Sequence, residues 1–196
     1  MKNYDRKYFD HWYHSGAAVV KPELLQRRVR HAVAAAEFTL GREIGSVLDV
    51  GCGEALWRAP LKRMRPGIRY VGIDSSDYVV RRFGARRNIR KGDLARLGKM
   101  ALKRPFDLVI CSDVIAYVSL PDLRRGLAAL RKLTRGIAYI DAYTTSDDFV
   151  GDRQDWNHRS EATYRKAFAE AGLVSCGLNC WIAREQLHLL SALEHC

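Results

Sequence analysis

The chain has 196 residues, of which 47% are hydrophobic and 28% charged, and a formal net charge of +11. This balance is ordinary for a soluble globular protein, and the length suits one domain rather than two. The sequence contains no apolar run of the roughly 18 residues that a membrane span needs. Its polar start, MKNYDRKYFDHWYHSG, lacks the apolar region of a secretory signal, so we expect a cytoplasmic protein without a membrane partner.

The first 40 residues are expected to form a helical lid or cap. Residues 22–40 predict a helix with Pro22 in its first turn and an apolar stripe along one face, ended by Gly41. Upstream, Tyr8, Trp12 and Tyr13 belong to a cluster of aromatic residues with helical spacing. Such a cluster is typical of core packing, or of a lid that closes over a ligand.

Strands and helices then alternate as far as residue 104. Residues 46–50 predict a buried strand, 54–64 a helix and 69–73 a second strand. A second helix is expected over 76–83, ended by Gly84, and a short third strand over 88–90.

The alternation continues to the end of the chain. The sequence predicts strands over 106–112 and 136–141 and helices over 121–134 and 160–171, with an Asp-rich loop or lid over 144–159. Two closely spaced strands, 174–178 and 180–183, are expected to pair antiparallel. A last helix is expected over 185–194.

This order predicts one α/β domain spanning residues 1–196. We expect a Rossmann-like, doubly wound sheet of seven strands over 46–183, mostly parallel with an antiparallel C-terminal strand and helices on both faces. Residues 184–196 would add the C-terminal helix.

The turn after the first strand, VLDVGCGEALW, favours a nucleotide without phosphate groups. It has Gly51 and Gly53, but Leu56 stands where a dinucleotide-binding turn has its third glycine. Glu54 would repel a phosphate. Asp74 follows Gly53 by 21 residues, the distance of the acid that binds ribose hydroxyls. An adenosine that carries a cationic centre and no phosphate fits both the acid at Asp74 and a turn that disfavours phosphate.

Four motifs in order resemble the class I S-adenosylmethionine-dependent methyltransferases, in particular their small, single-domain bacterial members. They are VLDVGCGEA, GIDSS at 72–76, GDL at 92–94 and FDLVICSDVIAYV at 106–118. The resemblance covers residues 46–183 and implies S-adenosylmethionine as cofactor and S-adenosylhomocysteine as product.

The resemblance also implies which residues hold the cofactor. Its methionine end would lie against Asp49, Gly51, Cys52 and Gly53, its ribose against Asp74 and Ser75, and its adenine against Asp93 and Leu94. Cys111, Ser112 and Asp113 would line the floor beside the sulfonium. One departure is Ala55, where the family often has glycine, and we expect a slightly tighter turn without loss of binding.

Candidate catalytic residues lie at the ends of the fourth and fifth strands and in the loop beyond them: Asp113, Tyr117, Tyr143 and His158. Methyl transfer needs a base only when the acceptor must lose a proton, and each of these residues also has a structural explanation. The cysteines, including Cys52, Cys111 and Cys196, form no C-x-x-C pair, so we expect no metal site.

Three functions remain open on the sequence. A compact methyltransferase would act on oxygen or nitrogen of a small molecule. An RNA methyltransferase would use the stretch from Arg81 to Arg104, which has ten basic residues against one acid, Asp93. A protein that binds the cofactor without catalysis is the third. The acceptor is not determined, and with Leu187, Leu190 and Leu193 on one side of the last helix, both a monomer and a homodimer are compatible.

Overall fold

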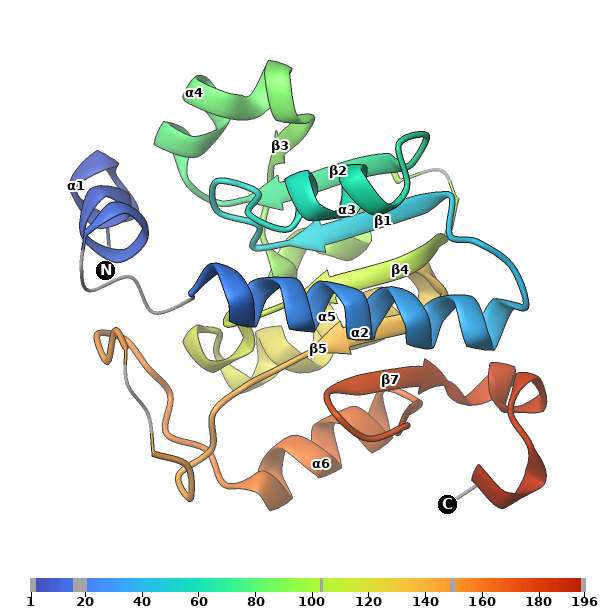
Figure 1. Cartoon of the computed structure of the whole chain (residues 1–196). Helices are drawn as coiled ribbons and strands as arrows, with labels where there is room; N and C mark the ends of the chain where they lie inside the picture. The colour runs from blue at the N-terminus through green and yellow to red at the C-terminus, as the bar shows by residue number, and fades with distance from the viewer. Residues whose placement is uncertain (1–2, 16–20, 103, 149–150, 195–196) are drawn as a thin grey trace.

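The computed structural model describes residues 3–15, 21–102, 104–148 and 151–194. Its centre is one seven-stranded sheet with the strand order β3-β2-β1-β4-β5-β7-β6 (Figure 1). The first five strands in the chain pair parallel, and β7 runs antiparallel to both β5 and β6. The strands are β1 (Ser46–Val50), β2 (Arg69–Asp74), β3 (Ile89–Lys91), β4 (Phe106–Cys111), β5 (Thr134–Ile140), β6 (Leu173–Ser175) and β7 (Cys180–Ala183).

Helices cover both faces of the sheet, which confirms the predicted doubly wound α/β fold. One face packs against α2, α3 and α4 and the other against α5 and α6. Every residue of β1 and β4 is buried, because a central parallel strand has helices above and below it. The helices are α2 (Pro22–Leu40), α3 (Arg58–Met64), α4 (Asp77–Arg87), α5 (Leu120–Leu133) and α6 (Glu161–Glu170).

Three predicted helices differ from those observed. The helix after β1 begins at Arg58 instead of residue 54, because the intervening residues form turns in which Ala55 has φ 60°. Helix α4 continues past Gly84 to Arg87 and ends at Asn88, which adopts the left-handed conformation. A glycine inside a helix lowers its stability but does not end it unless the backbone turns there.

The prediction of a C-terminal α-helix over 185–194 is wrong. The chain there forms two short 3₁₀ helices, Arg184–Leu189 and Ala192–Glu194. Their side chains are mostly exposed, and Leu193 is 90% exposed. Most helical stability comes from packing an apolar face, and this segment has little surface to pack against.

Two segments lie beyond the carboxyl ends of the central strands. The N-terminal segment forms α1 (Arg6–Phe9) and a π-helical turn, Asp10–His14. In Figure 1 it lies, in blue, off the end of the sheet toward which β1 points, and the orange loop between β5 and α6 extends to the same end. Ligands of doubly wound sheets bind at this end.

Among the described residues, no helix combines the length and the apolar character needed to cross a bilayer. The same part of the chain contains no cluster of three or more His, Cys, Asp or Glu side chains arranged for a metal ion. Cys196 lies outside the described residues.

Candidate functional site

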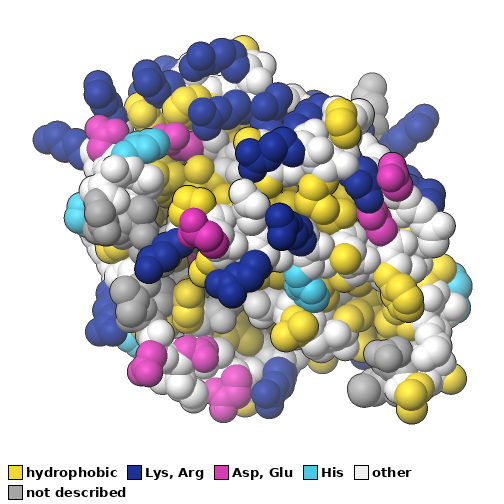
Figure 2. All heavy atoms as spheres, in the orientation of Figure 1, with side chains coloured by type: hydrophobic (Ala, Val, Ile, Leu, Met, Phe, Trp, Pro, Cys, Tyr) yellow, Lys and Arg dark blue, Asp and Glu magenta, His cyan; other side chains and the backbone are white. Residues whose placement is uncertain are grey.

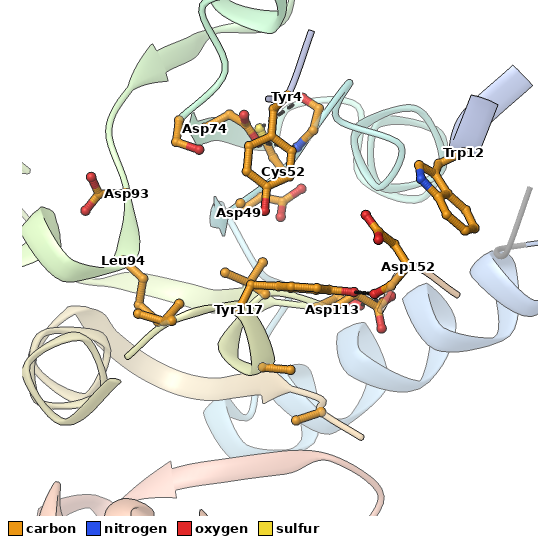
Figure 3. Close-up of a pocket in the computed structure, with 18 of the residues that line it drawn as sticks. Tyr4, Trp12, Asp49, Cys52, Asp74, Asp93, Leu94, Asp113, Tyr117 and Asp152 are labelled. Carbon is orange, nitrogen blue, oxygen red and sulfur yellow. Dashed lines mark hydrogen bonds between the residues drawn. The ribbon is translucent and has the colours of Figure 1, made fainter. Parts of the chain in front are cut away.

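A cavity of about 620 Å³ lies at the carboxyl ends of the strands. Its wall is built from the turns after β1 and β2, the segments after β3, β4 and β5, the N-terminal segment and the start of α2. Figure 3 shows Asp93 and Leu94 at one end, Asp49 and Cys52 in the middle, and Asp113, Asp152 and Trp12 toward the other end. The order along the cavity is therefore the order of the strand ends in the sheet.

The turn after β1 needs glycine at two positions. Gly51 has φ 71° and Gly53 φ 52°, and the backbone NH groups of Gly51 and Cys52 both donate to the carbonyl of Ile73. A Cβ on Gly51 would lie 2.2 Å from Val114, and one on Gly53 2.2 Å from the Tyr13 hydroxyl oxygen. The turn thus brings bare backbone to the cavity wall, where a side chain would collide.

Asp74 is fixed by the backbone of its neighbours. One carboxylate oxygen accepts from the NH of Gly53 at 2.7 Å, and the other accepts from the NH of Ser76 at 2.8 Å. Burial raises the pKa of this carboxyl, while the two NH donors act against the rise. Each oxygen keeps a second lone pair, so the carboxylate is oriented and still able to accept from a ligand hydroxyl.

Asp49 lies at the centre of the cavity wall and is 2% exposed. Its carboxylate accepts a hydrogen bond of 2.6 Å from the hydroxyl of Tyr70. Burial raises its pKa to about 7, against the effect of the Tyr70 hydrogen bond. A cation bound beside it would favour the ionised form, because opposite charges stabilise each other at low dielectric.

The end of β3 supplies the other residues expected at the nucleoside end. Asp93 caps the following 3₁₀ helix by accepting from the NH of Arg96, and Leu94 is 2% exposed with part of its surface on the cavity. Ser75 also lines the cavity. The structure brings Asp74, Ser75, Asp93 and Leu94 together, as the sequence motifs predict.

At the far end of the cavity Asp113 is part of a charged cluster. Arg28 approaches the carboxylates of Asp113 and Asp141, each at 3.5 Å. Asp141, at the end of β5, accepts from the Asp113 NH at 2.7 Å and from the Ser112 hydroxyl at 3.0 Å. Loss of hydration inside the cavity, and then the charge of Asp141, raise the pKa of Asp113 to about 6, although 40% of its side chain is still exposed.

Sequence reasoning missed Arg28 and Asp141 as site residues. Asp141 follows an apolar strand just as Asp49 and Asp74 do, so the same rule would have found it. Arg28 has no such signal, because it is one of several arginines on a helix and only the packing of α2 directs it to the cavity.

The N-terminal aromatic residues line the same cavity, and the Tyr13 hydroxyl lies against the backbone of Gly53. Tyr4, Tyr8, Phe9, Trp12 and Tyr13 all contribute to its wall. The Tyr4 and Tyr8 rings pack edge to face with centroids 5.0 Å apart.

Two polar contacts hold this segment to the sheet end. The Ser76 hydroxyl donates to the carbonyl of Tyr4 at 2.5 Å, and the His14 ring nitrogen Nε2 lies 3.1 Å from the buried carboxylate of Glu54.

The remaining candidate site residues differ in whether they line the cavity. Tyr117 and Tyr143 line the cavity, and the Tyr117 hydroxyl donates to the backbone carbonyl of Asp152 at 2.7 Å. Cys52 also contributes to the wall, whereas Cys111 packs into the core on the face of α5, because alternate residues of β4 point to opposite faces. His158 is exposed beside Trp156 and does not line the cavity.

The cavity fits a cationic nucleoside better than a dinucleotide. Oriented carboxylates at Asp74 and Asp93 suit hydroxyl and amine donors, and the glycine turn allows close approach of the ligand. No helix begins directly at this turn, since α3 starts only at Arg58, so a pyrophosphate would lack the helix N-terminus that usually binds it.

Comparisons with known proteins agree with this geometry. A family model described as "Methyltransferase domain" matches residues 48–136, which include the glycine turn and the ends of β1 to β4. A comparison with curated protein sequences found no match.

Solved structures of methyltransferases share the fold. A SAM-dependent methyltransferase from Archaeoglobus fulgidus is similar with a TM-score of 0.64 and 17% identity over 87% of this chain and 76% of that one. A TehB-like SAM-dependent methyltransferase from Corynebacterium glutamicum has a TM-score of 0.61 and 17% identity over 85% and 82%. The plantazolicin methyltransferase BamL, solved with SAH and a substrate analogue, has a TM-score of 0.61 and 15% identity over 78% and 66%.

The chain spans 66% of the length of BamL and 57% of that of a putative O-methyltransferase from Nostoc punctiforme, which is 12% identical with a TM-score of 0.55. Likeness at such identities establishes the fold alone. The family match adds to the likeness in fold, because it covers the glycine turn and the ends of four strands that form the cavity wall. Residues 48–136 of the chain therefore match a methyltransferase domain, and the chain has the fold of S-adenosylmethionine-dependent methyltransferases.

Proposed function

We propose that this chain is an S-adenosylmethionine-dependent methyltransferase that transfers the methyl group to an oxygen or nitrogen of a small-molecule acceptor. The observation that carries the proposal is the single cavity, which continues from the nucleoside end at Asp74 and Asp93 to Asp113 and Tyr143. A cofactor bound along the strand ends would leave the Asp113 end of this space for an acceptor. The N-terminal segment covers that space, so a small molecule suits it better than a polymer.

The residues that would hold the cofactor follow the strand order. Gly51, Cys52 and Gly53, with Asp49, would hold its methionine end. Asp74 and Ser75 would accept from the ribose hydroxyls, and Asp93 with Leu94 would meet the adenine. Ser112 and Asp113 would lie beside the sulfonium.

When bound, the cofactor supplies a methyl group that a sulfonium makes electrophilic. The chain's own contribution is then to align the acceptor and exclude water, which can account for much of the rate enhancement. The aromatic rings of Tyr4, Tyr8 and Trp12 close the cavity on the side away from the sheet. Tyr117 and Tyr143 form the wall near Asp113.

The test is calorimetric binding of S-adenosylhomocysteine to Asp74→Asn. The amide keeps the side chain's shape but removes a charged acceptor, and hydrogen bonds to a charged group contribute about 1.5–3 kcal/mol. We expect at least a tenfold loss of affinity. Asp77→Asn is the control, because Asp77 lies on the exposed start of α4 and pairs with Lys91.

Undiminished affinity in Asp74→Asn, or no binding to the unaltered protein, would refute the proposed cofactor site. A screen of small oxygen and nitrogen acceptors with labelled S-adenosylmethionine then tests the acceptor class. Product from RNA but from none of the small molecules would refute that part of the proposal.

A further inference from the structure

The charge of the cavity wall is opposite to that of the molecule. The whole chain has 33 Lys and Arg against 22 Asp and Glu. Among the described residues that line the cavity, Arg28 is the one Lys or Arg side chain. The acidic side chains that line it are Asp49, Asp74, Asp93, Asp113, Asp122 and Asp152.

The cofactor accounts for only part of this negative charge. Asp49, Asp74 and Asp93 lie at its proposed positions. Asp122 pairs with Arg125 on the same helix. The charge that remains at the acceptor end comes from Asp113 and Asp152.

Arg28 does not neutralise this end of the cavity. Its guanidinium lies 3.5 Å from the carboxylates of both Asp113 and the buried Asp141. One positive charge is therefore shared between two negative charges. Asp152 adds a third carboxylate on the cavity wall, from the loop between β5 and α6. In Figure 3 the side chains of Asp113 and Asp152 lie close to the hydroxyl end of Tyr117.

Aromatic rings surround the same space. Tyr4, Tyr8 and Trp12 line it from the N-terminal segment, and Tyr117 and Tyr143 from the segments after β4 and β5. The faces of aromatic rings attract cations, and they do so most strongly where water is excluded. Carboxylates among aromatic rings are the combination that binds ammonium groups and rejects anions.

We propose that the methyl acceptor is a cationic amine, whose ammonium group binds between Asp113, Asp152 and the aromatic rings of the N-terminal segment. This inference rests on the proposed function and narrows its acceptor class from oxygen or nitrogen compounds to amines. The acceptor nitrogen must lose one proton to free its lone pair. The Asp113 carboxylate takes that proton and passes it to solvent at the open side of the cavity, where its side chain is 40% exposed.

The test uses choline, a permanent cation, and 3,3-dimethylbutan-1-ol, which has the same shape without the charge. Each is titrated calorimetrically into protein saturated with S-adenosylhomocysteine. We expect choline to bind at least tenfold more tightly than the neutral alcohol. Asp113→Asn and Asp152→Asn should each weaken choline binding at least fivefold. Asp152→Asn, which lies outside the proposed cofactor site, should change the affinity for S-adenosylhomocysteine less than twofold.

Asp148→Asn is the matched control, because this exposed acid belongs to the same loop and does not line the cavity. A pH series adds a second readout. Since the Asp113 carboxyl titrates with a pKa of about 6, choline affinity should rise from pH 5 to pH 7 in the unaltered protein, and less so in Asp113→Asn.

Equal affinity for choline and the neutral alcohol, no binding of choline, or unchanged choline affinity in both Asn variants would overturn the amine proposal. All three results are compatible with normal binding of S-adenosylhomocysteine, so the proposed cofactor site would stand. If the unaltered protein does not bind S-adenosylhomocysteine, the proposed function itself is refuted.

Discussion

At the scale of single residues, the cavity is built from acids held at strand ends. Asp49 and Asp74 each end or nearly end a strand, and both are less than a tenth exposed. Buried carboxylates are costly unless they are hydrogen-bonded, and here a tyrosine hydroxyl and two backbone NH groups supply the bonds. These hydrogen bonds offset only part of the cost of burial, since the pKa of both carboxyls is still raised.

Asp49 gives a prediction about stability and pH. Its carboxyl has a pKa of about 7 in the folded protein against 3.8 ordinarily, because it is buried. Between pH 4 and pH 7 the unfolded chain loses this proton and the folded protein keeps it. The contribution of Asp49 to the free energy of unfolding therefore falls as the pH rises through this range, and levels off above it.

Asp49→Asn removes the titration, while its amide oxygen can still accept from Tyr70. We expect the variant's free energy of unfolding, minus that of the unaltered protein, to increase from pH 4.5 to pH 7.5. Urea unfolding at several pH values measures this difference, with the exposed Asp148→Asn as control. A difference that is constant with pH would show that Asp49 does not titrate in this range.

At the scale of elements, the N-terminal segment forms part of the cavity wall. Phe9 is 2% exposed and stacks on Tyr78 of α4, while Tyr4, Tyr8, Trp12 and Tyr13 line the cavity. Phe9 belongs to the core on the α2 side of the sheet, and Tyr4, Tyr8 and Tyr13 pack against that core. Because these residues both pack on the core and line the cavity, a lid function stays a prediction.

Deleting residues 1–14 tests the lid. We expect a protein that still unfolds cooperatively, because one core is intact and the other loses only Phe9 of its buried residues. It should bind S-adenosylhomocysteine at least tenfold more weakly, because one part of the cavity wall is gone. Circular dichroism and calorimetry measure the two properties. Lys7→Ala, an exposed change on the same helix, should alter neither.

A truncated chain without cooperative unfolding would show that the aromatic residues belong to the core, which is the other interpretation of their spacing. A folded truncated protein with unchanged affinity for S-adenosylhomocysteine would exclude a lid function for this segment.

At the scale of the whole molecule, positive charge lies outside and negative charge lines the site. Figure 2 shows Lys and Arg side chains gathered along the upper edge of this face, where Figure 1 places α4. Arg81, Arg86 and Arg90 are exposed there. Arg87 is different, because its guanidinium donates to the Glu54 carbonyl and lies 4.0 Å from the centre of the Phe83 ring.

The triple change Arg81→Ala, Arg86→Ala and Arg90→Ala separates a nonspecific basic surface from an RNA site. We expect methyl transfer to small acceptors to be unchanged, because none of the three lines the cavity. Retention on RNA should weaken and depend less on salt, with a slope smaller by roughly 2, since each phosphate contact on single strands contributes about 0.7. Methyl transfer to RNA that the triple change abolishes would favour the RNA methyltransferase instead.

How much the sequence could predict follows from the range of the interactions involved. The strands, the helices α2 and α6, the glycine turn and the acids at 49, 74 and 93 depend on neighbours within a few residues, so their local pattern was sufficient. The end of α4 and the C-terminal segment were predicted wrongly. The backbone of α4 does not turn at Gly84, and the C-terminal segment has little surface against which a helix could pack its apolar face.

The sequence by itself determined the alternation of strands and helices and the acid-ended turns, because hydrophobic periodicity and turn chemistry are local properties. Only the tertiary structure decided which distant side chains share the cavity. Arg28 meets Asp113 and Asp141, and Tyr8 and Trp12 line the same space as Asp152, because the sheet order and the packing of α2 bring them together. No local pattern specifies such contacts, since they depend on the whole chain being folded.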